Sequence, residues 1–148
     1  MAEPLALGVG NPAETPPAEK LEYTYPGGPR DVEAMYVATD ASITLISKRP
    51  LRNTLGVLRP ALVFRISAEA WREAKPVVAC LTDSLPIVPG SARGRLITDA
   101  ALAPDSRHVA VRTYTQVFVF AVDSATGLIG RSVAADDLQR RRTSRAPG

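Results

Sequence analysis

Two stretches of this chain match each other without a gap at an offset of 66 residues. Residues 33–47 contain an acidic residue, an alanine, a short apolar strand, a polar turn and a second strand, and residues 99–113 repeat this order. Glu33 and Asp99 stand at the same phase of the two copies. This duplication constrains the fold more than any other feature, because each copy predicts two antiparallel strands joined by a turn.

A β-hairpin that is repeated with an acid at constant phase is typical of β-propeller blades. Alternating apolar residues predict strands at 21–25, 32–38, 42–48, 62–66, 76–81, 96–103, 108–113 and 116–122. Residues 67–73 predict one or two helical turns, with Ser67 as the N-cap. Because a blade takes about 40 residues, we expect an all-β fold of antiparallel sheets, a partial β-propeller of about two blades with long loops.

The chain divides into three predicted parts. Residues 1–20 are rich in Pro, Ala, Glu and Gly and predict a flexible arm, whereas residues 21–130 form the partial propeller. Residues 124–130 predict a turn, and residues 131–148 predict a disordered tail. The tail carries five arginines and two acids, which accounts for the whole net charge of +3, so the body gives no nucleic-acid signal. No apolar run of about 20 residues predicts a membrane span.

The residue types that usually carry chemistry are sparse. Cys80 is the single cysteine, which excludes an internal disulfide, and its apolar surroundings predict a small buried side chain. Trp71 and Tyr114 are expected to pack in the core or at its rim. His108 is expected at the surface, and neither a nucleophile motif nor a phosphate loop accompanies it. We therefore predict no catalytic residue, no metal ligand set and no cofactor.

Charged residues at the ends of the innermost strands are the candidates for ligand binding. The acids stand at strand starts and the bases at strand ends, the full set being Asp31, Glu33, Lys48, Asp99 and Arg112. In a propeller these ends lie near the central channel, where they can bind a cation or a polar ligand. The alternative is that they bond to backbone amides or to one another and fix adjacent blades. On this alternative, at least one acid contacts Lys48 or Arg112, and loss of Asp99 costs more stability than loss of Asp123.

Three separated motifs resemble those of a known family. Residues 25–34 resemble "YPDGxRDxEAL", residues 46–49 resemble a strand-ending "(V/S)(T/S)K", and residues 97–115 resemble "VTGAxxSPDGRRVALRTYT". These motifs belong, in this order and spacing, to an uncharacterised group of bacterial β-propeller proteins. The resemblance covers residues 21–123, and Ser106 stands where the family has its turn glycine, which loses an easy positive φ.

The resemblance has consequences for the rest of the chain. The further blades of the family are missing on both sides, which suggests a gene fragment or a truncated chain. The family resemblance implies a secreted or cell-envelope location for full-length relatives, although this chain has no signal peptide of its own. Two blades cannot close a ring, so open sheet edges and an uncovered face favour self-association.

We expect from these observations a binding or scaffold module with no catalytic activity of its own. The alternative is a fragment of a propeller hydrolase of the lactonase, esterase or phytase type, with a carboxylate metal site at the channel mouth. The sequence identifies no particular partner, and its only predicted association is with itself.

Overall fold

The computed structural model describes residues 17–48, 54–57, 59–85, 87 and 96–132, and of residues 131 and 132 only the backbone. The first 16 residues and the last 16, for which the sequence predicts a flexible arm and a disordered tail, lie outside the described residues.

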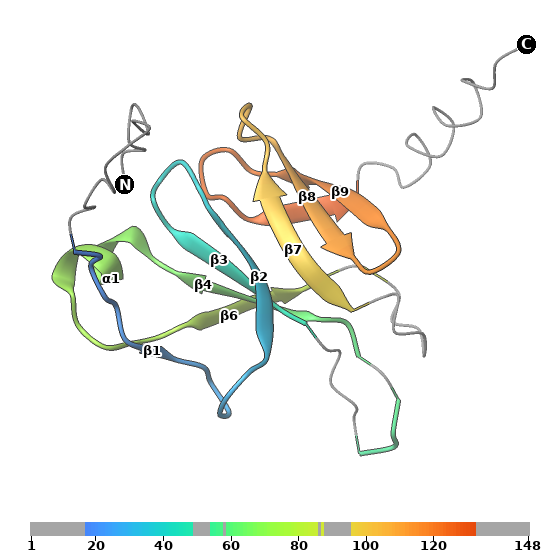
Figure 1. Ribbon diagram of the computed structural model, residues 1–148, viewed down its shortest axis with the longest axis horizontal. Coiled ribbons are helices and arrows are strands. Elements are labelled where there is room, and N and C mark those ends of the chain that lie inside the picture. The colour runs from blue at the N-terminus through green and yellow to red at the C-terminus, as the bar shows by residue number, and fades with distance from the viewer. Residues whose placement is uncertain (1–16, 49–53, 58, 86, 88–95, 133–148) are drawn as a thin grey trace, which may run out of the picture.

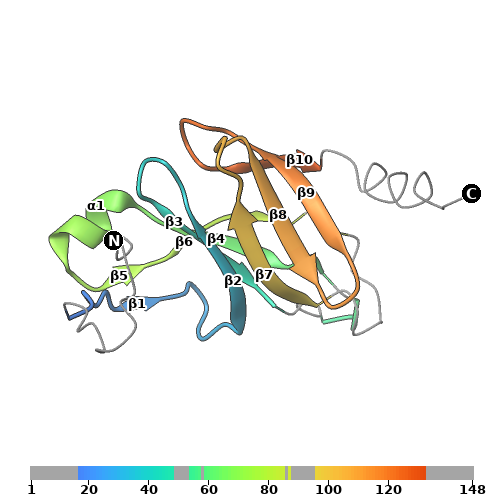
Figure 2. The same ribbon diagram turned by 45° about the horizontal axis from the view of Figure 1, so that its top comes forward.

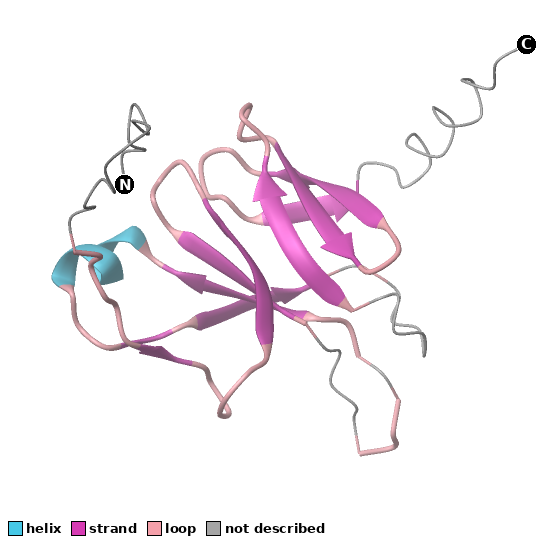
Figure 3. Cartoon of the chain, in the orientation of Figure 1, coloured by secondary structure: helices cyan, strands magenta, loops and turns pink. Residues whose placement is uncertain are grey.

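The described chain is almost entirely β-structure, arranged as two four-stranded antiparallel sheets (Figure 3). The first sheet has the order β2 (Val32–Val37), β3 (Ile43–Ser47), β4 (Leu62–Ile66) and β6 (Cys80–Ser84). The second sheet has the order β7 (Ile97–Leu102), β8 (His108–Thr113), β9 (Val117–Val122) and β10 (Ile129–Ser132). Both sheets are meanders, since their strands follow one another in chain order. The predicted all-β fold class is therefore confirmed.

The two sheets pack against each other through one shared core. Alternate residues of each strand face this core, among them Tyr36 and Ile46 of the first sheet and Val109, Val111 and Phe120 of the second. Their burial is expected from period-two alternation, which places residues i and i+2 on one face of a strand. Figures 1 and 2 show β2 and β7 side by side at the junction of the sheets. Two meanders joined in this way are consistent with a partial, propeller-like fold.

The outer face of the first sheet is covered by the N-terminal part of the described chain. Two short parallel strands, β1 (Tyr23–Thr24) and β5 (Val77–Val78), pair beside the helix α1 (Ala68–Glu73). A second apolar cluster lies beneath them, centred on the buried Leu45, Phe64, Ile66 and Ala79. The hydroxyl of Ser67 accepts a hydrogen bond from the N–H of Ala70, which confirms the predicted N-cap.

The turn between β9 and β10 joins the two sheets at one end. The Tyr36 hydroxyl of β2 donates a buried hydrogen bond of 2.7 Å to the carbonyl of Gly127. Thr39 donates to the carbonyl of Ser124 at 3.0 Å, and the Arg65 guanidinium of β4 contacts the carbonyl of Thr126. We call these contacts the turn latch. Since residues up to 91 positions apart take part, the latch fixes the relative position of the sheets.

Several local expectations differ from the structure. Cys80 is exposed, because it lies in β6, an outer strand whose residues are all exposed. Trp71 is 39% exposed and Tyr114 is 60% exposed, so both project further from the core than predicted. Residues 129–132 form β10 where the sequence predicted turn and tail, because Ile129 pairs with Val122 of β9. Ser106 adopts φ 56° even without the glycine of the family pattern.

Candidate functional site

The five predicted ligand residues lie at the end of the sheets where β2 and β7 begin, which we call the strand-start end. The backbone itself connects the two sheets there. The N–H of Lys48, just after β3, donates to the carbonyl of Asp31 at 2.7 Å, and the N–H of Ile97 donates to the carbonyl of Lys48 at 3.2 Å. The first residue of β7 is thus bonded directly to the end of the first sheet.

Glu33 and Lys48 form the central ion pair of this end. Their side-chain oxygen and nitrogen are 2.8 Å apart, and the Lys48 side chain is only 17% exposed. The hydrogen bond from Glu33 raises the pKa of Lys48, partial burial opposes this, and the charges of Glu33, Tyr114 and Asp31 add to the increase. The predicted contact between an inner-strand acid and Lys48 is therefore confirmed.

Glu33 and Asp99 occupy equivalent positions in the two sheets. Each is exposed, each precedes a buried alanine of the shared core, Ala34 or Ala100, and each lies at an irregularity in the pairing of its strand. Equal phase therefore places both carboxylates at the strand-start end, as predicted. Their contacts differ, because Asp99 accepts the N–H of Ala100 at 2.8 Å.

Arg112 lies directly opposite Asp99 in the pairing of β7 with β8. Both side chains are exposed, and within the described part of the chain no ion pair joins them. The structure therefore divides the five candidates into two groups. Asp31, Glu33 and Lys48 lie together on the first sheet, whereas Asp99 and Arg112 share the second.

Tyr114 is a residue of this end that the sequence argument missed. It follows β8 in a turn where the N–H of Thr113 donates to the carbonyl of Gln116 at 2.8 Å. Its charge acts on Lys48 of the first sheet, so its ring lies across the junction from the Glu33 pair. Its position in a two-residue turn, and not in a strand, was the available signal of exposure.

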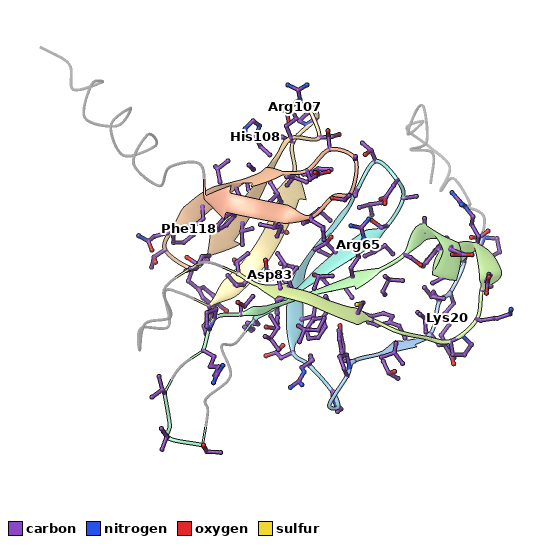
Figure 4. The ribbon with its side chains drawn as sticks, turned by 180° about the vertical axis from the view of Figure 1, so that it is seen from behind. Lys20, Arg65, Asp83, Arg107, His108 and Phe118 are labelled. Carbon is purple, nitrogen blue, oxygen red and sulfur yellow. The ribbon has the colours of Figure 1, made fainter. Side chains whose placement is uncertain are left out.

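Other candidate chemistry lies elsewhere or is not formed. In the described residues, no group of three or more His, Cys, Asp and Glu side chains could hold a metal ion. His108 lies with Arg107 at the tip of the β7–β8 hairpin, and its Nδ1 is 2.9 Å from an oxygen of Asp105 (Figure 4). The pKa of Asp105 is lowered first by the N–H of Arg107 and then by His108.

A groove of about 540 Å³ runs along the β1–β5 pair, lined mainly by Leu21, Tyr23, Val77 and Val78. None of the five candidate residues lines this groove. The strand-start end is thus a polar surface formed by side chains, separate from this apolar groove.

Comparisons with known protein families, with curated proteins and with solved structures found no match. The resemblance to bacterial β-propeller proteins therefore stays a prediction. No helix among the described residues is long and apolar enough to cross a membrane.

Proposed function

We propose that this chain is a propeller-type binding or scaffold module, without catalytic activity of its own, that contacts its ligand at the strand-start end. The observation that carries the proposal is the junction of β2 and β7. There the Glu33–Lys48 pair, Asp31 and Tyr114 are brought together from segments more than 60 residues apart in the sequence.

The chemistry of this end favours a ligand with polar or charged side chains, such as a peptide segment. Carboxylates and an ammonium group lie beside one exposed aromatic ring, which is a combination that binds peptides through charge and ring contacts. Because Lys48 is mostly covered and already paired, it is held in one position before a ligand arrives.

The proposal is tested by titrating the full isotope-labelled chain with a lysine-rich and a glutamate-rich peptide, followed by backbone amide signals. We expect one peptide to shift the signals of residues 31–33, 47–48 and 113–114. Lys48→Met should weaken that binding about tenfold, as is common when one partner of a charged contact is removed. Lys75→Met is the matched control, because Lys75 forms an exposed pair with Glu73 on the helical side.

Two outcomes contradict the proposal. Neither peptide shifting these signals would refute a ligand site at this end. Hydrolysis of p-nitrophenyl acetate or p-nitrophenyl phosphate that Glu33→Gln abolishes would favour the hydrolase alternative, and a calcium-dependent thermal midpoint would favour its metal site.

A further inference from the structure

The outer face of the second sheet has a regular composition that its pairing register defines. Across β7, β8 and β9, the outward residues form one row of Asp99, Arg112 and Val117 and a second row of Ala101, Ala110 and Val119. Their neighbours in each strand, such as Val111 and Phe120, point into the shared core. The face is therefore a flat floor of small apolar residues bordered by one acid and one base.

This face is exposed, in contrast to its counterpart on the first sheet. The first sheet has Leu45 and Phe64 on its outer side, and the segment containing β1, α1 and β5 covers them. On the second sheet Ala101, Asp99 and Arg112 are exposed, and Val117 is 44% exposed. Figure 2 shows the helix and the β1–β5 pair on the side of the first sheet only.

We propose that the outer face of the second sheet binds a second copy of this chain. A two-fold axis parallel to the strands, between β7 and β8, places Asp99 opposite Arg112 of the second copy, and the same contact occurs again on the other side of the axis. It also places Ala101 opposite Ala110 of the second copy. The face is thus self-complementary in charge, and its small side chains let the two sheets approach closely.

The pairing of charges selects a second copy over an unrelated partner. Asp99 and Arg112 are direct cross-strand neighbours, so a two-fold axis between their strands forms two ion pairs at once. The face is small, about 20 Å by 15 Å from strand dimensions. Such an area lies well below that of a standard interface, so we expect a weak dimer that forms only at high protein concentration.

The exposed edge of β6 is the competing surface for self-association. Its pairing with β4 has an irregularity between Val63 and Phe64, and it carries the exposed Asp83 (Figure 4). Irregular pairing and a charge on an edge strand both oppose the addition of a further strand. We therefore place the dimer contact on the outer face of the second sheet, and not on this edge.

The test is analytical ultracentrifugation of the full chain over a range of concentrations. Asp99→Arg makes the face wholly basic and Arg112→Asp makes it wholly acidic, so each variant alone should dimerise at least about tenfold more weakly than the original chain. An equal mixture of the two variants should recover the dimer, because opposite faces then meet. The doubly exchanged chain should also recover it. Asp83→Arg is the matched control and should dimerise like the original chain.

The mixture distinguishes a broken interface from a damaged fold, since a variant that does not fold cannot recover a dimer by mixing. An original chain that stays monomeric at every concentration would overturn the proposal. So would a mixture that remains monomeric, or an effect of Asp83→Arg as large as that of Asp99→Arg, which would place the contact at β6. The proposal is independent of the ligand site, because Glu33 and Lys48 are unchanged in every variant.

Discussion

Replacing Gly127 by alanine should test whether the turn latch holds the two sheets together. Gly127 is buried and adopts φ +69°, and a methyl group at this position would lie 2.4 Å from Cβ of Ala38. Gly127 also supplies the carbonyl that accepts the buried hydrogen bond from Tyr36. The substitution therefore strains the backbone and forces the turn away from the first sheet.

The expected magnitude has two parts. A non-glycine residue in the left-handed region costs about 1–2 kcal/mol, and an extra methyl group in a packed site costs about 1–3 kcal/mol. Gly127→Ala should thus lower the free energy of unfolding by about 2–5 kcal/mol. Gly56→Ala isolates the first part, because Gly56 adopts φ +74° and has open space around its Cβ position.

Urea denaturation followed by circular dichroism would measure both variants. We expect Gly127→Ala to unfold at clearly lower urea than Gly56→Ala, and the double variant with Ala38→Gly to regain most of the difference, because the opposing methyl is then absent. Equal losses for Gly127→Ala and Gly56→Ala would refute the reasoning, since the contact with Ala38 would then contribute nothing.

Three further predictions concern turns and acids. Ala41→Gly and Ser106→Gly should each raise the free energy of unfolding by up to about 1 kcal/mol in urea denaturation, because both residues adopt positive φ; a loss of stability would contradict this. Asp123→Ala should lower the thermal midpoint more than Asp99→Ala, which reverses the order expected from sequence, because Asp123 accepts two backbone N–H groups and Asp99 one. The pKa of Asp40 is lowered, so its contribution to stability is present above about pH 4 and is lost as the pH falls further; Asp40→Asn should therefore show a smaller fall in thermal midpoint between neutral and acidic pH.

The strands of the duplicated hairpin could be predicted because their signal is local. Alternation of apolar residues marks β2, β3, β7 and β8 to within about two residues, and the same phase places Glu33 and Asp99 correctly. β10 could not be predicted, since its four residues include Gly130 and its strand depends on pairing with β9. Local sequence carries no record of such a partner.

The error at Cys80 has the same physical origin. An apolar run predicts burial only when both neighbours of a strand are present, and β6 has one neighbour in its sheet. Ala79 is fully buried, whereas Cys80 and Leu81 beside it are exposed. Whether a strand is central or at an edge depends on topology, which a short window of sequence does not contain.

The candidate site was predictable in its residues but not in its division. The offset of 66 residues indicated which charges share one end, yet it treated the two copies as equal. In the structure Glu33 pairs with Lys48, whereas Asp99 faces outward beside Arg112. This difference follows from small shifts in strand pairing, which decide whether opposite charges meet at 2.8 Å or remain apart.

The two outer faces show why a repeated fold need not repeat its surface. The first sheet places Leu45 and Phe64 on its outer side, and these large side chains stabilise the fold only when a further layer covers them, which β1, β5 and α1 supply. The second sheet places Ala101 and Ala110 there, and exposing such small side chains costs far less. That face can therefore remain open in a stable monomer and still offer Asp99 and Arg112 to a second copy. The same hairpin thus serves once as part of a closed core and once as a contact surface.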